Sequence, residues 1–393
     1  MKIGFITPPI SECGGIQRVL TLLANYLTQF CDVTVISLND FGQKPYYYMD
    51  ERVRIIYYNQ YCHKKWRIFR RGIRGVAKRY KCVLPAAVGA YAYYPRYMTC
   101  KIVQILSEER CDCVIASTVH CSVLLGMIAG DLKGTKLIGW HHNSYHIYFQ
   151  TPGQGYYIQS KLSKKALKEL DELVTLTSHD AQEYKKHMGI NARYIYNPLG
   201  IVCESKSDVS NPVLLFVSRL KIQQKGLDLL ISIADILFHQ RSYKNWTLRI
   251  VGGGSDEQEV RKMVKECNLD DQIEFLGERE DVEKEYVNAS IFLSTSRWEG
   301  FGMVVTEAME CGLPVVSFKT DGPSEIITDG ENGYLIDNYD LQQYADAVEM
   351  LMCNEERRRR MSEKASERAK DFHPEAIMKQ WKKLIYVDNM ENL

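Results

Sequence analysis

The residues best suited to chemistry in this sequence lie between positions 296 and 312. Glu299 and Glu307 are separated by seven residues, and two glycines, Gly300 and Gly302, follow the first glutamate. Good helix formers come next, which predicts a helix whose N-terminus opens onto the glycine turn. The first amides of a helix have no intrahelical acceptor and lie at its positive dipole end, so this turn is suited to hold a phosphate group.

The helix is expected to run from Met303 to Cys311, with Gly312 at the C′ position that commonly ends helices. Its apolar residues fall on one face, so it should pack inward. A carboxylate on either side of an anion site suits a ligand with hydroxyl groups on both sides of a diphosphate, and a nucleotide sugar is such a molecule. The alternative is an ordinary loop and helix with two solvated glutamates, and the apolar residues around both glutamates argue against it.

The run EGFGMVVTEAMECGLPVV, residues 299–316, resembles the donor-site signature of the retaining glycosyltransferases of family 4, which have the GT-B fold. The resemblance implies that Glu299 contacts hydroxyl groups of the transferred sugar and that Glu307 contacts the ribose. It also implies that the donor lies against the residues between them. Those residues include Gly300, Phe301, Gly302, Met303 and Val304.

A second group of candidate residues lies in the loop 218–226, between a predicted strand, Val213–Val217, and a predicted helix, Leu227–Phe238. Arg219 and Lys225 are cations in this loop, and the ligands of doubly wound sheets gather at such strand ends. Arg can form paired hydrogen bonds with a phosphate, and Lys acts as a compact point charge. Ordinary loop solubility would explain both cations, but their spacing also resembles the diphosphate clamp of the same family.

Three glycines complete the candidate donor site. Gly277 ends a predicted strand, Ile273–Gly277, at a place where the resembled family seats the nucleotide base. In the N-terminal half, the predicted strand Lys2–Thr7 is followed by a turn-rich loop with Gly14 and Gly15 and then by a helix. Turn geometry alone explains these two glycines equally well, whereas the resemblance implies that their loop approaches the donor diphosphate.

A cluster of histidines follows the predicted strand Lys136–Gly139, in the run Trp140–His146. In the resembled family a histidine just after this strand lies near the transferred sugar, and either His141 or His142 could fill that role. His141 is favoured because it is nearer to the strand end, but adjacent residues point apart and the choice stays open. No acidic or cysteine ligand follows at a matching spacing, so we expect no metal and no other cofactor.

The strand–loop–helix pattern of the N-terminus starts again at Val213, so the chain is expected to form two similar α/β halves. We predict a GT-B arrangement of two Rossmann-like domains facing across a cleft. The acceptor-binding domain would comprise residues 1–200, and the nucleotide-sugar-binding domain residues 205–372, with the polar, turn-rich segment 204–212 as the linker. The final segment, 373–393, is expected to return to the first domain as a helix, as it does in GT-B enzymes.

Composition limits the class and compartment of the protein. The chain has 393 residues and a formal net charge of +1, which gives no reason to expect a nucleic-acid partner. Its twelve cysteines are scattered, and several, including Cys82 and Cys311, stand in apolar runs, which favours reduced, buried thiols over a disulfide framework. No signal-peptide pattern and no run of ~18 uncharged apolar residues is present, so we expect a cytoplasmic protein without a transmembrane helix.

The segment 61–81 is unusually basic, because nine Lys and Arg residues interleave with apolar and aromatic side chains such as Trp66, Ile68 and Phe69. A segment of this kind suits the surface of an anionic membrane. A solvated helix face explains the pattern about equally well. The first interpretation predicts a peripheral protein at the inner face of the cell membrane.

These observations predict a retaining glycosyltransferase. It would move a hexose or N-acetylhexosamine from a nucleotide-diphosphate sugar, with UDP favoured, to a glycan or polyprenyl-diphosphate-linked acceptor in the synthesis of surface polysaccharide or glycoconjugate. Arg219, Lys225 and the helix N-terminus would stabilise the departing diphosphate without a metal. The alternatives are a non-catalytic GT-B partner subunit, which usually loses the clamp, and a GT-B epimerase or phosphorylase.

Overall fold

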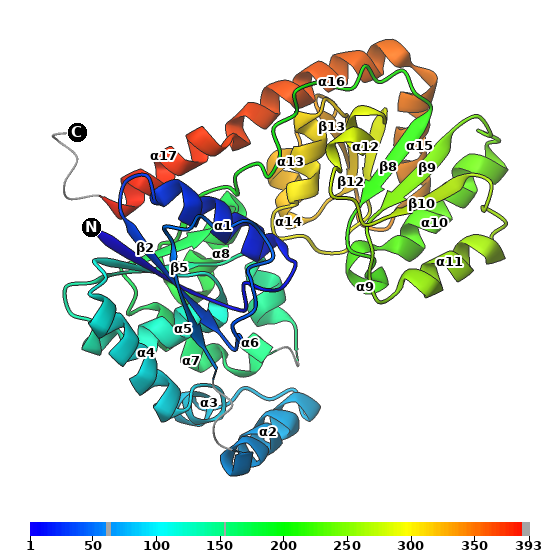
Figure 1. Ribbon diagram of the computed structural model, residues 1–393. Coiled ribbons are helices and arrows are strands. Elements are labelled where there is room, and N and C mark those ends of the chain that lie inside the picture. Colours follow the sequence, from blue (N-terminus) through cyan, green and yellow to red (C-terminus); the bar gives the residue numbers. More distant parts are fainter. Residues whose placement is uncertain (60–63, 153–154, 387–393) are drawn as a thin grey trace. The chain divides into compact units, whose positions relative to one another are not determined.

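The chain forms two compact units, each built on a parallel sheet. The computed structural model describes residues 1–59, 64–152 and 155–386 (Figure 1). The first unit comprises Met1–Tyr196 together with Met378–Leu393, and the second comprises Asn197–Ile377.

The first unit contains a seven-stranded parallel sheet in the order β3-β2-β1-β4-β5-β6-β7. The central strands are buried apolar runs, as expected for a parallel sheet that is covered on both faces. The strands are β1 (Lys2–Thr7), β2 (Asp32–Leu38), β3 (Arg54–Tyr58), β4 (Cys113–Ala116), β5 (Lys136–Trp140), β6 (Glu172–Thr175) and β7 (Arg193–Tyr194).

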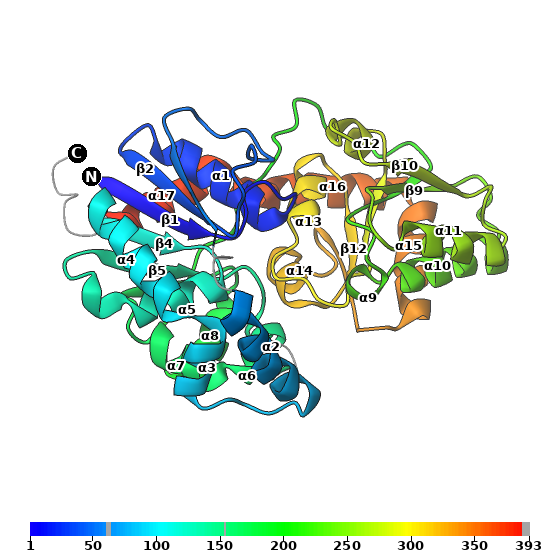
Figure 2. The ribbon, with the colours of Figure 1, turned by 60° about the horizontal axis from the view of Figure 1, so that its bottom comes forward.

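The helices of the first unit pack on this sheet and on one another. Helix α2 contacts α3 and α6, beside which it lies in both views (Figures 1 and 2). The elements are α1 (Gly15–Leu27), α2 (Lys64–Arg79), α3 (Ala86–Tyr93), α4 (Arg96–Glu109), α5 (Val119–Met127), η1 (Ala129–Asp131), η2 (His146–Gln150), α6 (Gly155–Ile158), α7 (Ser160–Leu167) and α8 (Ser178–Met188).

The second unit repeats the architecture with a six-stranded parallel sheet in the order β10-β9-β8-β11-β12-β13. Its strands are β8 (Val213–Val217), β9 (Thr247–Val251), β10 (Ile273–Gly277), β11 (Ile291–Ser294), β12 (Val315–Phe318) and β13 (Gly333–Ile336). Its helices are α9 (Ile222–Lys225), α10 (Leu227–Asp235), η3 (Ile236–Gln240), α11 (Glu257–Glu266), α12 (Glu283–Val287), α13 (Met303–Glu310), α14 (Asp321–Ile326), α15 (Leu341–Cys353), α16 (Glu355–Ala369) and η4 (Lys370–Phe372).

The last helix, α17 (Pro374–Ile385), starts in the second unit and continues into the first. Its Trp381 is buried and packs edge-to-face on Trp140 of β5, with ring centroids 4.8 Å apart. The ammonium group of Lys136 donates to the Leu384 carbonyl oxygen (2.7 Å). The return of the C-terminal helix to the first unit is therefore confirmed.

The expectation of reduced, buried thiols at Cys82 and Cys311 is wrong. Cys311 is not a free thiol but is disulfide-bonded to Cys203, and Cys82 is exposed. The pairing was hidden because 108 residues separate the two cysteines and only the fold brings their Cα atoms to 5.5 Å. Helix α8 is capped by Thr177, whose hydroxyl accepts from the Asp180 amide (3.1 Å).

Candidate functional site

The predicted donor residues of the second unit come together at one point of its sheet. Strands β8 and β11 are neighbours, and the chain runs outward in opposite directions on either side of this pair. Such a switch point in a parallel sheet leaves a crevice at the carboxyl ends of the strands, where ligands bind. The loop with Arg219 and Lys225 follows β8, and the loop with Glu299 follows β11.

The loop after β11 presents the N-terminus of α13. Gly302 caps this helix with a φ of +94°, in the left-handed region that favours glycine, and its carbonyl oxygen accepts from the Val305 amide (2.8 Å). The first amides of the helix, including those of Met303 and Val304, point out of its end without intrahelical acceptors. Together with the positive end of the helix dipole, they provide an anion site.

Gly322 fixes this loop from the side of α14. A Cβ atom at position 322 would lie 2.0 Å from the Phe301 carbonyl oxygen, so only glycine allows the two backbones to approach. The Gly322 amide also donates to the Glu299 carbonyl oxygen (3.1 Å). Phe301 is buried and packs on Phe372, with ring centroids 5.7 Å apart. The backbone that carries Glu299 is thus held on two sides.

The two predicted cations of the loop after β8 differ in their surroundings. The ammonium group of Lys225 donates to a carboxylate oxygen of Glu299, and the two side chains are only 14% and 17% exposed. Arg219 is exposed. The structure therefore brings Lys225 and Glu299 into contact, while the guanidinium of Arg219 is accessible to a ligand.

A glycine run after β9, residues 252–254, shapes the backbone around Arg219. Gly252 has a φ of +122°, and a Cβ atom there would lie 1.9 Å from the Ser218 carbonyl oxygen. The Leu220 amide donates to the Gly253 carbonyl oxygen (2.8 Å). Three consecutive glycines after a strand are a sequence signal for close backbone approach, so this part of the site could have been found from the sequence.

Gly226 and Arg297 tie the loop after β8 to the loop after β11. Gly226 has a φ of +64°, and a Cβ atom there would lie 2.0 Å from the Thr295 carbonyl oxygen. The Arg297 guanidinium donates to both carboxylate oxygens of Asp228 (2.8 and 2.6 Å). These hydrogen bonds lower the pKa of Asp228. Arg297 and Asp228 are positioning residues that the sequence did not reveal, because 69 residues separate them.

Glu307 lies in α13 and Gly277 at the end of β10, both in the second unit. Glu307 is buried and accepts from the Tyr286 hydroxyl (3.3 Å), so its carboxylate is oriented rather than solvated. Gly277 ends β10 with a φ of +69°, and its carbonyl oxygen accepts from the Gly252 amide (2.8 Å). Tyr286 was not foreseen as part of the site.

In the first unit, Gly14 and Gly15 stand where the loop after β1 enters α1. A Cβ atom at Gly14 would lie 2.4 Å from the Gln17 side-chain oxygen. Gln17 is buried, and its side-chain amide donates back to the Pro9 carbonyl oxygen (3.1 Å). The turn is therefore closed by its own helix, with its amides at a helix N-terminus like that of α13.

His141 and His142 follow β5, and both are neutral at physiological pH. Burial lowers the pKa of each imidazole to about 3. The Nδ1 atom of His141 lies 2.6 Å from the Tyr184 hydroxyl oxygen, and the His142 ring packs against Trp140, with centroids 4.3 Å apart. Among the described residues, the Nε2 atoms of both histidines are buried without a hydrogen-bond partner. The choice between them therefore stays open.

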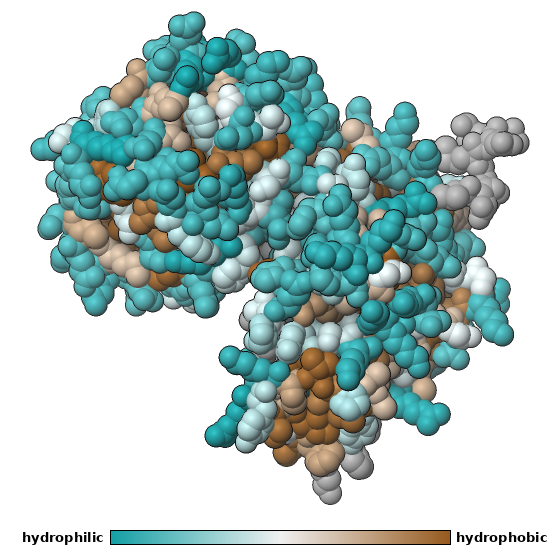
Figure 3. All heavy atoms as spheres, turned by 180° about the vertical axis from the view of Figure 1, so that it is seen from behind, coloured by the Kyte–Doolittle hydropathy of each residue, from teal (hydrophilic) through white to brown (hydrophobic). Residues whose placement is uncertain are grey.

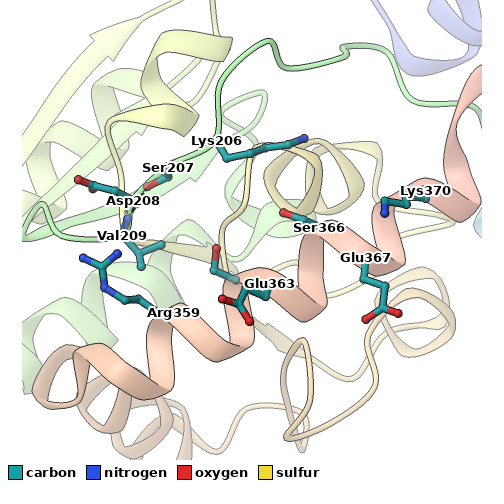
Figure 4. Close-up of a pocket in the computed structure, with 10 residues that line it drawn as sticks. Lys206, Ser207, Asp208, Val209, Arg359, Glu363, Ser366, Glu367 and Lys370 are labelled. Atoms are coloured by element: carbon teal, nitrogen blue, oxygen red, sulfur yellow. Dashed lines mark hydrogen bonds between the residues drawn. The ribbon is translucent and has the colours of Figure 1, made fainter.

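Other features of the chain lie apart from these residues. A hollow of about 600 Å³ lies between the segment 206–209 and α16, and the side chains that line it include Lys206, Arg359 and Glu363 (Figure 4). It contains none of the predicted site residues. In the part of the chain that the structure describes, no group of three or more His, Cys, Asp and Glu side chains is placed to hold a metal ion. None of the helices in that part is long and apolar enough to span a membrane.

Two Rossmann-like parallel sheets, with a helix N-terminus and two basic residues at the switch point of the second, are the features expected of a GT-B glycosyltransferase. Comparison with known sequences agrees. Residues 13–201 match the profile described as "Glycosyltransferase Family 4", and residues 203–368 match "Glycosyl transferases group 1". The chain belongs to the family-4 glycosyltransferases of the GT-B fold.

Similar proteins match over nearly the whole chain. An uncharacterized glycosyltransferase of Haemophilus influenzae is 28% identical, covering 98% of this chain and 99% of its own. A Campylobacter jejuni N-acetylgalactosaminyltransferase, named for an acceptor linked to PP-undecaprenol, is 24% identical, covering 98% of both chains. Among solved structures, HepE from Anabaena in complex with UDP superimposes with a TM-score of 0.74 at 19% identity, covering 98% of this chain and 100% of HepE.

Proposed function

We propose that this protein is a retaining glycosyltransferase that uses a nucleotide-diphosphate sugar, most suitably a UDP-sugar, and transfers a hexose or N-acetylhexosamine. The observation that carries the proposal is the arrangement at the β8–β11 switch point. There Lys225 contacts Glu299, Arg219 is exposed in the loop after β8, and the N-terminus of α13 opens in the loop after β11. A diphosphate with an attached sugar fits this combination of groups.

In this proposal, the transferred sugar leaves a diphosphate whose negative charge grows as the glycosidic bond breaks. Preorganised donors aimed at that charge are most effective in the transition state. The Lys225 ammonium group, the Arg219 guanidinium and the amides of Met303 and Val304 supply them. These groups do the work that a divalent cation does in other enzymes, so no metal is required.

The carboxylates have separate roles. Glu299 accepts hydrogen bonds from hydroxyl groups of the sugar and, through its contact with Lys225, keeps that ammonium group in the site. Glu307, held by Tyr286, accepts from the ribose hydroxyls. Gly277 leaves room for the base at the end of β10. The second unit is thus the donor domain in our proposal, and the first is the acceptor domain.

In the first unit, a neutral histidine after β5 suits a hydrogen bond to the transferred sugar. An imidazole whose pKa is about 3 is uncharged at neutral pH, so it does not repel the positive charge that develops on the sugar. The turn at Gly14 and Gly15 would bring further amides to the diphosphate.

The acceptor we propose is a glycan or a polyprenyl-diphosphate-linked sugar in the synthesis of a surface polysaccharide or glycoconjugate. The Campylobacter jejuni relative supports this, because its name gives a PP-undecaprenol-linked acceptor, and so does an amylovoran biosynthesis glycosyltransferase of Erwinia amylovora at 25% identity. An acceptor of this kind lies in a membrane. We therefore also propose that the protein works in the cytoplasm as a peripheral protein at the inner face of the cell membrane, with the 61–81 segment toward the lipid.

The intact clamp speaks against a non-catalytic partner subunit. Arg219, Lys225, Glu299 and Glu307 are all present, and the structure holds the last three in hydrogen bonds. An epimerase or phosphorylase of the same fold would bind the donor without transferring its sugar to an added acceptor.

A donor screen followed by a transfer assay tests the proposal. A ligand present at ~100 times its dissociation constant stabilises the folded protein by ~2.7 kcal/mol, so the correct nucleotide sugar should raise the melting temperature. Acceptor-dependent release of the nucleotide should follow, with an α-linked product by NMR from an α-linked donor. Saturating EDTA should leave the rate unchanged. Donor binding without acceptor-dependent transfer would contradict the proposal, and so would an activity that EDTA abolishes and Mg²⁺ or Mn²⁺ restores.

A further inference from the structure

Helix α2 of the first unit, together with Tyr80 directly after it, carries a row of apolar side chains that nothing in the described structure covers. Ile68, Phe69 and Tyr80 are 73%, 60% and 71% exposed, and Val76 is 58% exposed. Their positions fall within about one third of the helix circumference at 100° per residue. Scattered exposed apolar residues are normal on protein surfaces, but a contiguous row marks an interaction site.

The apolar row continues onto α3. The ring of Tyr91, which is 42% exposed, lies beside that of Phe69, with centroids 6.4 Å apart. In the space-filling view, brown side chains gather over this part of the first unit (Figure 3). Gly72 and Gly75 belong to the same outward side of α2, and a Cβ atom at either position would meet no atom within 4 Å. The outward side of α2 is therefore open.

The structure divides the cations of α2 into two sets. Arg70 is only 7% exposed, and its guanidinium donates to the Tyr97 hydroxyl oxygen (3.3 Å). The guanidinium of Arg74 lies over the Tyr93 ring, 5.6 Å from its centroid. These two arginines face the unit itself. A second set, Arg71, Lys78 and Arg79, is exposed beside the apolar row.

Acidic residues are missing from this part of the chain. No Asp or Glu occurs from position 52 to position 107, although the whole chain has 49 acidic residues and a net charge of only +1. The positive charge of α2 is therefore not neutralised by its neighbours in sequence. A second copy of this face would repel it, whereas a surface of negative charge would attract it.

We propose that the outward face of α2, extended by Tyr91 of α3, docks onto an anionic lipid bilayer. The apolar side chains enter the boundary between headgroups and acyl chains, and Arg71, Lys78 and Arg79 bind lipid phosphates. Arg70 and Arg74 hold α2 against the unit and do not touch lipid. This inference deepens the proposed function, on which its biological purpose rests, because it names the surface that would meet a lipid-linked acceptor.

Co-sedimentation of the full chain with vesicles tests the docking without any substrate. Vesicles of phosphatidylglycerol and phosphatidylcholine should bind the protein at low salt, and raising the salt or using phosphatidylcholine alone should release it. The triple variant R71S/K78S/R79S should lower the partition coefficient on the order of 100-fold, since each basic residue near an anionic surface contributes about fivefold. The variant I68S/F69S/Y80S should also lose binding, because it removes apolar side chains that enter the bilayer. These side chains are exposed, so the substitutions should not disturb the core.

The matched control R96S/K101S/K133S removes the same charge from other exposed positions of the first unit. It should bind nearly as well as the unchanged protein. An equal loss in this control would show that net charge and not the α2 face governs binding, and would overturn the inference. Equal binding to neutral vesicles, or none to anionic vesicles at low salt, would also overturn it. A dimer that forms without lipid and that the I68S/F69S/Y80S substitutions convert to monomers would also overturn it, because the face would then bind a second copy of the chain.

The failure of this inference is distinguishable from failure of the proposed function. With a short, water-soluble acceptor, R71S/K78S/R79S should keep the transfer rate of the unchanged protein, and only transfer to a vesicle-embedded acceptor should fall. Transfer without vesicle binding would refute only the docking of α2 on a bilayer. Vesicle binding without transfer to any acceptor would refute only the proposed glycosyltransferase activity.

Discussion

Replacing Lys225 by Ala distinguishes a cation that acts on the donor from one that only neutralises a neighbouring carboxylate. In the structure, Lys225 and Glu299 form a largely buried ion pair, with 14% and 17% of their side chains exposed. If Lys225 stabilises the departing diphosphate, its loss removes one preorganised donor from the transition state. Removing one such donor lowers kcat by about 10²–10³-fold, or ~2.7–4 kcal/mol.

A double-mutant cycle with Glu299→Gln separates the two roles. Lys225→Ala leaves the Glu299 carboxylate without its ammonium partner in a poorly hydrated place, which is unfavourable by itself. Because Glu299 also contacts the sugar in our proposal, the reference for K225A/E299Q is the single variant E299Q. If the unpaired carboxylate were the whole effect, K225A/E299Q and E299Q would have the same rate. If the lysine acts on the diphosphate, K225A/E299Q should be about 10²–10³-fold slower than E299Q, because the missing positive charge is not replaced.

The assay is the initial rate of acceptor-dependent nucleotide release at saturating donor, measured together with the melting temperature of each variant. Lys221→Ala is the control from the same loop, since Lys221 is 50% exposed and pairs with Asp256 (3.5 Å) away from Glu299. It should keep the rate within about twofold. A K225A rate within about fivefold of the unchanged protein, or a K225A/E299Q rate equal to that of E299Q, would refute the reasoning.

Three further predictions follow from other parts of the structure. Gly322→Ala should weaken UDP binding, measured by calorimetry, at least about tenfold while the protein stays folded. A Cβ atom 2.0 Å from the Phe301 carbonyl oxygen must displace the loop after β11, which carries Glu299. Unchanged affinity would contradict this. Trp381→Ala should lower the free energy of unfolding by ~3–5 kcal/mol in a denaturant titration, since this buried ring packs on Trp140, and a loss below ~1 kcal/mol would be incompatible with that packing. The free energy of unfolding should decrease as the pH falls from ~6.5 toward ~3. Burial holds the pKa of His141 and His142 at about 3, whereas a histidine of the unfolded chain has a pKa of ~6.5, so the unfolded chain binds more protons in this range. An unfolding free energy that does not change from pH ~6.5 to ~4 would argue against neutral buried imidazoles.

Local patterns were enough to predict the two-unit α/β fold and the elements around the donor residues. Strands of buried parallel sheets are short apolar runs, and glycine turns mark their ends, so β8, β11 and the start of α13 were all readable along the chain. Gly312 was correctly expected to end α13, where it has a φ of +82°. These features depend on residues within one turn or one strand of each other.

Contacts between distant segments could not be predicted in the same way. The Arg297–Asp228 pair, the Cys203–Cys311 disulfide and the Tyr286–Glu307 hydrogen bond each join residues more than twenty positions apart. Nothing in the local sequence of either partner specifies the other. The split of the α2 cations was equally hidden, because helical periodicity groups Arg70 with Arg74 but does not say which side of the helix meets the unit.

The return of α17 has a consequence for the order in which the protein is made. The second unit is a continuous stretch, Asn197–Ile377, whereas the first unit needs residues from Met378 onward. The ribosome therefore finishes every residue of the second unit before it supplies Trp381, whose ring covers Trp140. The half of the protein that is translated first therefore completes its core last. We expect a chain that lacks α17 to expose the Trp140 ring and to aggregate more readily than the unchanged protein.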